Sequence, residues 1–293
     1  MLISIIVCTR DRCDKLTALL NSLSVVRVPD GWKYGVIIVD NGSTDATYEV
    51  CKPFLDSPGR TFRYFYEGKK GKSFALNRGI REARGDILAF TDDDCIVDPS
   101  WLEVIANEYV ADPQLAFQGG RVELYNPEDR SNSTVTFREK IDLSARPDML
   151  FRPTIMGANM SFRREVVTGI GEFDTLLGPG SRHGAVAEDL DYQYRAVRKG
   201  FKVVYFPGMV VYHDHGRQTD KEIDAVSYQY SVGRGSFYCK HLFSDVAVIR
   251  RLYWDLTWQV RRMVSNLFAG KSTRVGRRTL RALAVGALSR LFG

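Results

Sequence analysis

Short apolar runs alternate with amphipathic stretches along the first 92 residues of the chain. Runs rich in β-branched and aromatic residues predict strands at 2–8, 34–40, 61–67 and 86–91. Between these runs, apolar residues spaced three or four apart predict helices at 15–24, 45–55 and 73–84. Because strands that alternate with helices form α/β folds, we expect a mostly parallel sheet with helices on its faces.

Residues 246–293 carry a helical pattern of another kind, in which apolar residues on one face oppose basic residues on the other. The apolar set of the first stretch is Ile249, Leu252, Tyr253, Leu256, Val260, Met263, Val264 and Leu267, and 280–291 repeats the pattern. We therefore expect a C-terminal amphipathic helical extension after residue 245. Its apolar faces either pack on the catalytic body or a partner subunit, or lie in the interface of an anionic membrane.

Charge separates this extension from the rest of the chain. The 293 residues are 44% hydrophobic and 26% charged, as in a globular protein, and the net charge is +6. Residues 246–293 hold ten Lys or Arg and one acid, which leaves 31 bases against 34 acids in 1–245. Since the body is slightly acidic, we expect no nucleic-acid partner, and nucleic-acid binding through the basic tail stays a secondary alternative.

Cysteine spacing and hydropathy suggest the compartment. The five cysteines show no C-x-x-C spacing, so neither a zinc site nor a disulfide framework is predicted. The N-terminus lacks the pattern of a secretory leader, and no apolar stretch reaches the roughly 18 residues of a membrane span. We expect a cytoplasmic protein, at most peripheral on the cytoplasmic face of the membrane, and a homo-oligomer is left open.

Polar residues follow three of the predicted strands, at 9–11, 40–43 and 92–94. In parallel sheets, ligands bind beyond the carboxyl ends of the strands, so these side chains are expected to face one crevice. The three successive carboxylates of Asp92, Asp93 and Asp94 repel one another, and a divalent cation offsets that cost. Oxygen ligands favour Mn²⁺ or Mg²⁺, which commonly join protein carboxylates to substrate phosphates.

Two common nucleotide-binding motifs are missing. Gly71-Lys72-Ser73 resembles the end of a P-loop, but that motif requires glycine where the chain has Tyr66. No G-x-G-x-x-G follows the first predicted strand, so dinucleotide binding has no support. A sugar-phosphate nucleotidyltransferase is the alternative enzyme, although the glycine-rich basic loop expected after its first strand is also missing.

Together these segments resemble glycosyltransferase family 2, whose members have the GT-A fold. The resemblance covers the first-strand element 5–12, the second-strand element 39–45, the asparagine-bearing helix 72–85 and an Asp-x-Asp motif at Asp92 and Asp94. It implies a catalytic domain at 1–245, with a nucleotide-binding half at 1–98 and an acceptor half at 99–245. It also implies transfer of a sugar, most commonly from a UDP-sugar, to a saccharide or lipid-linked acceptor in glycan or surface polysaccharide synthesis.

The same resemblance assigns the donor site. Thr9, Arg10 and Asp40 would lie against the base and ribose, Asp92 near the ribose, and Asp94 on the metal. Further donor-site candidates are Lys72, Asn77 and Asp93, of which Asp93 is expected to point away from the ligand. A late histidine can complete the metal shell in such enzymes. His213 and His215 would share one side of a continuing strand, and the choice between them stays open.

The acceptor side is expected in the second half of the chain. The segment that begins Gly157-Ala158-Asn159 resembles the floor of the acceptor site, and residues 178–181 could form a lid. A helix is predicted from residue 187, and the resemblance makes Asp189 the general base, with Glu188 as the fallback. Acids at a helix start also have an ordinary explanation in the helix dipole.

One base suffices for inverting transfer, because the metal helps the diphosphate to leave. The chain lacks the Gln-x-x-Arg-Trp motif and the membrane spans of processive relatives, so we expect it to add one sugar or a few.

Overall fold

The computed structural model of the chain describes residues 1–56 and 61–292. These residues form two compact units: unit 1 comprises 1–173 and 189–218, and unit 2 comprises 174–188 and 219–293. The division after residue 218 differs from the expected boundary at 245, because helix α7 (Asp220–His241) packs with the C-terminal tail.

Unit 1 is built on a mixed sheet with the strand order β3-β2-β1-β4-β8-β6-β9-β5, and β7 pairs with β9. The strands are β1 (Leu2–Thr9), β2 (Lys33–Asp40), β3 (Phe62–Tyr66), β4 (Ile87–Asp92), β5 (Cys95–Val97), β6 (Leu115–Leu124), β7 (Ile141–Asp142), β8 (Met160–Arg163) and β9 (Lys202–His213). Strands β1 to β4 pair in parallel, as predicted, whereas β8 runs antiparallel to both β4 and β6. The second half of the chain therefore makes the sheet mixed.

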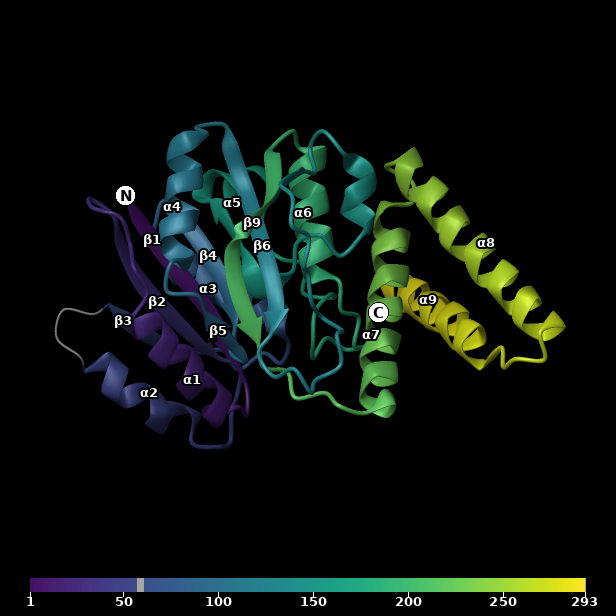
Figure 1. Cartoon of the computed structure of the whole chain (residues 1–293), viewed down its shortest axis with the longest axis horizontal. Helices are drawn as coiled ribbons and strands as arrows, with labels where there is room; N and C mark the ends of the chain where they lie inside the picture. Colours follow the sequence, from purple (N-terminus) through teal and green to yellow (C-terminus); the bar gives the residue numbers. More distant parts are fainter. Residues whose placement is uncertain (57–60, 293) are drawn as a thin grey trace. The chain divides into compact units, whose positions relative to one another are not determined.

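Six helices of unit 1 lie around this sheet (Figure 1). They are α1 (Cys13–Ser24), α2 (Thr47–Leu55), α3 (Lys72–Glu82), α4 (Trp101–Ala111), α5 (Arg164–Ile170) and α6 (Glu188–Arg198), of which the first residue belongs to unit 2. The strands and helices predicted for the first 92 residues are confirmed, with ends shifted by no more than two residues. The apolar pattern succeeds here because β1, β2 and β4 are largely buried and the helices turn apolar residues toward the sheet.

An aromatic cluster fills the core where the two halves of the sheet join. Phe162 of β8 stacks on Phe90 of β4 with ring centroids 4.8 Å apart, and Tyr192 of α6 stacks on Phe162 at 5.0 Å. Phe173 lies 4.1 Å from Tyr192. This cluster fixes helix α6, and with it the predicted general base, against the strand that precedes the Asp-x-Asp motif.

Unit 2 contains three helices: α7, α8 (Val246–Phe268) and α9 (Arg274–Phe292). Thr219 and Glu222 form a capping box at the start of α7. Helices α7 and α9 approach closely, since a Cβ atom on Gly286 would lie 1.9 Å from the carbonyl oxygen of Val232. The predicted helical extension is confirmed. Within the described ranges, none of the helices has the length and apolar character needed to cross a membrane.

Candidate active site

Sheet register brings the polar strand ends together. Thr9, the last residue of β1, pairs with Asp40 at the end of β2, and the preceding Cys8 pairs with Asp92 at the end of β4. Thr9 and Asp40 are buried, and the side chain of Asp92 is 23% exposed. The expected meeting of three strand ends at one edge of the sheet is therefore seen.

The β2 end of the site is held by a dense set of hydrogen bonds. Asp40 accepts one from the backbone N–H of Ser43 at 2.7 Å and one from the hydroxyl of Tyr64. Asn41 donates to the carbonyls of Glu67 and Lys69 and accepts from the N–H of Gly71, which fixes the loop in front of α3. This arrangement sets the position of Lys72 at the start of that helix.

Arg12 neutralises part of the acidic cluster. Its Nη1 lies 3.1 Å from Asp93 Oδ1 and 2.7 Å from Asp94 Oδ2. Burial raises the pKa of Asp93 to about 6, although Arg12 opposes the shift. Burial also acts to raise the pKa of Asp94, but the hydrogen bond with His213 and the charge of Arg12 leave that pKa well below its usual range. Asp94 is therefore the carboxylate of the pair that stays ionised.

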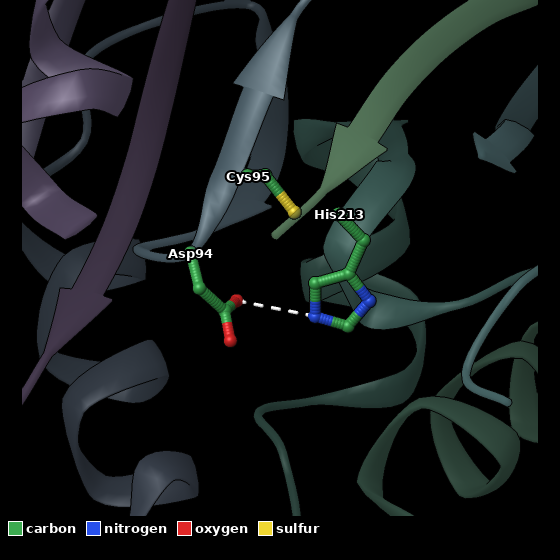
Figure 2. A group of neighbouring side chains, drawn as sticks. All are labelled: Asp94, Cys95 and His213. Atoms are coloured by element: carbon green, nitrogen blue, oxygen red, sulfur yellow. Dashed lines mark ion pairs between the residues drawn. The ribbon is translucent and has the colours of Figure 1, made fainter. Parts of the chain in front are cut away.

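Asp94 and His213 point toward each other across the site, with Cys95 beside them (Figure 2). His213 Nε2 lies 3.2 Å from Asp94 Oδ1, and its Nδ1 lies 3.1 Å from the carbonyl oxygen of Ser133. Since a carbonyl only accepts, Nδ1 carries a proton and Nε2 is the atom that faces the carboxylate. In the neutral ring Nε2 carries a lone pair and no proton. Nε2 and Asp94 Oδ1 can therefore face each other only with a proton or a cation between them.

This donor set fits a divalent cation. The ligand atoms of Asp94, Cys95 and His213 lie within 4.8 Å of one another. The N–H of Nδ1 held by a backbone carbonyl is the usual support of a metal-binding histidine. The pKa of His213 is raised, because its hydrogen bond and charge contact with Asp94 outweigh the opposing effect of burial. A proton therefore competes with a cation for this position.

His215 has a different environment. Its Nδ1 lies 3.3 Å from Asp129 and accepts a hydrogen bond from the backbone N–H of Arg217 at 3.0 Å. Nδ1 is therefore the acceptor, and Nε2 carries the proton of the neutral ring. Burial and the neighbouring charge of His213 lower the pKa of His215. The ring stands edge-on to His213, with the centroids 5.2 Å apart, so His215 packs against the histidine that faces Asp94.

Lys72 links the acidic cluster to the predicted general base. Its ammonium group pairs with Asp92, and its charge lowers the pKa values of both Asp94 and Asp189. Asp189 accepts hydrogen bonds from the N–H of Gly157 at 3.0 Å and from the N–H of Leu190 at 2.7 Å. Burial nevertheless raises its pKa. Lys72 thus acts both on Asp94, after the end of β4, and on Asp189, the second residue of α6.

Two predicted ligand contacts are not supported by the geometry. The amide of Asn77 exchanges two hydrogen bonds with the backbone of Phe173, at 2.9 and 2.8 Å. The amide of Asn159 accepts from Trp101 Nε1 and donates to the carbonyls of Arg121 and Met209. Both asparagines are buried and hold neighbouring segments together.

The roles of the remaining candidates stay predictions, and the structure gives their surroundings. Gly157 contacts Asp189 through its N–H, Ala158 is buried next to it, and Arg10 is exposed beside the Asn41 carbonyl at 3.1 Å. Glu188 is buried and falls in unit 2, so its role as the fallback base stays a prediction.

Sequence reasoning missed three contributors: Arg12, Asp129 and Ser133. A signal for Arg12 existed, since three adjacent carboxylates need a cation and this arginine follows the first strand end. Ser133 acts through its carbonyl, at a positive φ of 56°, and no side-chain pattern reveals that.

Comparison with known proteins decides the family. A model of glycosyl transferase family 2 matches residues 4–171, more than half of the chain. The chain belongs to glycosyl transferase family 2. It is 25% identical to Glycosyltransferase AglE of Haloferax volcanii over 256 residues, which are 87% of this chain and 79% of that protein. The protein is thus a glycosyltransferase of the GT-A fold, as the sequence predicted.

A further relative is a glycan synthase, and two solved structures are similar in fold. Poly-beta-1,6-N-acetyl-D-glucosamine synthase of Staphylococcus aureus is 27% identical over 60% of this chain, which spans only 41% of that protein. Mannosyltransferase PcManGT from Pyrobaculum calidifontis was solved with GDP-Man and Mn²⁺. It has a TM-score of 0.68 at 18% identity, and the similarity covers 99% of this chain and 87% of that one. Glucosyl-3-phosphoglycerate synthase from Mycobacterium tuberculosis, solved with Mn²⁺ and UDP, has a TM-score of 0.56 at 19% identity and covers 78% and 77%.

Proposed function

We propose that this glycosyltransferase moves a sugar with inversion from a nucleoside diphosphate sugar to a hydroxyl of a saccharide or lipid-linked acceptor. A UDP-sugar is the first candidate for the donor. The observation that carries the proposal is the facing pair of Asp94 Oδ1 and His213 Nε2, 3.2 Å apart, beside the strand ends that bear Thr9, Asp40 and Asp92. A carboxylate and an imidazole nitrogen that face each other can hold the divalent cation that a nucleoside diphosphate needs.

Donor binding uses the strand ends. Thr9, Arg10 and Asp40 receive the base and ribose, and Asp92 lies at the ribose with Lys72 beside it. Asp94 and His213 Nε2 would hold Mn²⁺ or Mg²⁺, which would supply positive charge to the departing diphosphate. Arg12 pairs with both Asp93 and Asp94 and reduces the repulsion between the two carboxylates before the donor binds.

Asp189 is the proposed general base. Two backbone N–H groups hold its carboxylate in place. Its raised pKa makes it a stronger base than an exposed aspartate, which favours removal of the acceptor proton as the hydroxyl attacks the anomeric carbon. Attack from the face opposite the diphosphate inverts the anomeric configuration. The acceptor approaches over Gly157 and Ala158, and one sugar or a few are added.

A thermal-shift panel tests the donor site. The full chain is heated with UDP or GDP, each with and without Mn²⁺, because a ligand that binds the folded state raises its melting temperature. We expect one nucleotide to stabilise the protein in a manner that depends on Mn²⁺. Asp94→Asn should remove this shift, and Asp30→Asn, which changes an exposed aspartate, should keep it.

The reaction is tested with UDP-sugars and GDP-sugars by following release of the nucleoside diphosphate. A shift that Asp94→Asn leaves intact would contradict the metal site. Release of pyrophosphate from a nucleoside triphosphate and a sugar phosphate would instead identify a nucleotidyltransferase.

A further inference from the structure

Helix α8 presents its apolar stripe to solvent. Each of six stripe residues is between 38% and 68% exposed: Ile249, Tyr253, Leu256, Val260, Val264 and Leu267. Phe268, at the end of the helix, is 91% exposed. The 23 residues of α8 extend about 35 Å at 1.5 Å per residue. An apolar stripe of this length is unusual on a free protein surface and indicates a binding face.

The opposite side of α8 explains why the stripe faces outward. Asp255 accepts from Arg234 and Tyr238 of α7 and pairs with Arg251 at 3.0 Å within α8. Val248 is the buried apolar residue of the helix. Polar contacts thus attach α8 to its own unit, together with Met263, whose side chain lies against Gly276 of α9. The six exposed stripe residues are left for another surface.

Basic and aromatic residues border the stripe. On a helical wheel, Arg250 and Arg261 lie directly beside the stripe, and Trp254 lies next to Arg261. The side chain of Trp254 is 65% exposed. Helix α9 begins a few residues after Phe268 with a second basic surface. There Tyr228 and four arginines line a hollow of about 530 Å³: Arg274, Arg277, Arg278 and Arg281. Arg278 lies 3.5 Å from Asp224, whereas the other three form no ion pair with any described residue.

We propose that unit 2 docks on an anionic lipid bilayer through α8 and the start of α9. The stripe enters the boundary between headgroups and acyl chains, Trp254 lies at headgroup level, and the arginines contact lipid phosphates. The tail supplies the charge for this, because residues 246–293 hold ten bases against one acid. The inference concerns where the enzyme acts and is independent of the chemistry proposed for unit 1.

Charge favours a lipid surface over a second copy of the chain. In a two-fold dimer the same patch occurs on both sides of the interface, so stripe-to-stripe packing would place the basic border of one protomer near that of the other. A bilayer that contains anionic lipid places negative charge next to the same border and accepts apolar side chains as well.

Co-sedimentation of the full chain with phosphatidylcholine vesicles, with and without phosphatidylglycerol, tests the proposal. We expect binding to the vesicles with phosphatidylglycerol, weakening at high salt, and a blue shift of tryptophan emission. Arg250→Glu with Arg261→Glu should weaken binding roughly a hundredfold, because each basic residue near an anionic surface adds to the affinity for that surface and each glutamate is repelled by it. Tyr253→Ser with Val260→Ser should weaken it without changing its dependence on salt.

The matched control is Lys33→Glu with Lys199→Glu, which reverses two exposed charges of unit 1 and should bind as the unchanged protein does. The proposal is overturned if the full chain stays in the supernatant, or if both α8 variants bind like the control. A dimer in light scattering that the Tyr253→Ser, Val260→Ser variant loses, without vesicle binding, would assign the stripe to a second copy. Salt-sensitive DNA binding without vesicle binding would assign the arginines to nucleic acid.

Discussion

Helix α1 of unit 1 and helix α8 of unit 2 have similar amphipathic sequences and opposite surroundings. The apolar face of α1 is buried, including Leu16, Leu19, Leu20 and Leu23. The apolar face of α8 is exposed, and a polar network centred on Asp255 attaches its other side. The comparison teaches that apolar periodicity predicts a helix and its faces, whereas the partner of a face depends on which neighbours the fold supplies.

The largest expected effect concerns the chemistry of unit 1. Asp189→Asn should lower kcat by about 10²- to 10⁴-fold, because the amide cannot accept the acceptor proton. Binding of the nucleoside diphosphate with Mn²⁺ should stay unchanged in the thermal-shift assay. In the unchanged enzyme, kcat/KM should fall as the pH drops through the raised pKa of Asp189, since only the ionised form acts as a base. If the variant stays active, another residue is the general base, and Glu188 is the next candidate.

Core truncation in unit 1 comes next. Phe162 is fully buried between Phe90 and Tyr192. Phe162→Ala should lower the free energy of unfolding by about 3–5 kcal/mol, from lost burial and the cavity that remains. Urea unfolding measures the change. A loss below about 1 kcal/mol would show that this aromatic cluster is not a close-packed core.

The crossing of α7 and α9 tests packing within unit 2. A Cβ atom on Gly286 would lie 1.9 Å from the carbonyl oxygen of Val232, so Gly286→Ala requires the helices to separate. We expect a loss of about 1–3 kcal/mol, typical of overpacking. Ala284→Ser, on the exposed side of α9, is the control and should change little. Thermal unfolding of the two variants side by side gives the answer, and equal melting temperatures would contradict the close crossing.

The buried carboxylate Asp93 gives a prediction that depends on pH. Its pKa is raised from 3.8 to about 6, so the folded protein binds this proton more tightly than the unfolded chain does. The resulting stabilisation is complete below pH about 4 and is lost as the pH rises through about 6. In metal-free protein, Asp93→Asn should therefore gain up to about 3 kcal/mol relative to the unchanged chain above pH about 7. Urea unfolding at two pH values measures this, and a pH-independent difference would contradict the shift.

The smallest effect is expected at the exposed C-terminal end of α8. Phe268→Ala makes the same chemical change as Phe162→Ala, but this ring is 91% exposed. The free energy of unfolding should change by less than about 0.5 kcal/mol. A large loss in urea unfolding would mean that the side chain is covered within the free protein, and the contrast between the two units would fail.

Much of the candidate site was predictable because its residues follow parallel strands that are neighbours in the sheet. Thr9, Asp40 and Asp92 occupy the carboxyl ends of β1, β2 and β4, and the register places them side by side. The roles of the two histidines were not predictable, because they depend on the backbone groups that contact each Nδ1 atom. Likewise, nothing local in the sequence shows that Phe173 occupies the amide of Asn77.

The sequence by itself determined the alternating strands and helices, the acidic strand ends, the family resemblance and the basic amphipathic tail. Each of these depends on local periodicity or on residues close together in the chain. The tertiary structure alone decided that His213 faces Asp94, that Lys72 acts on both Asp94 and Asp189, and that the stripe of α8 is exposed. The contact of His213 with Asp94 and the effect of Lys72 on Asp189 join residues more than a hundred positions apart. The exposure of the stripe depends on what does not pack against it, so only the folded chain specifies these features.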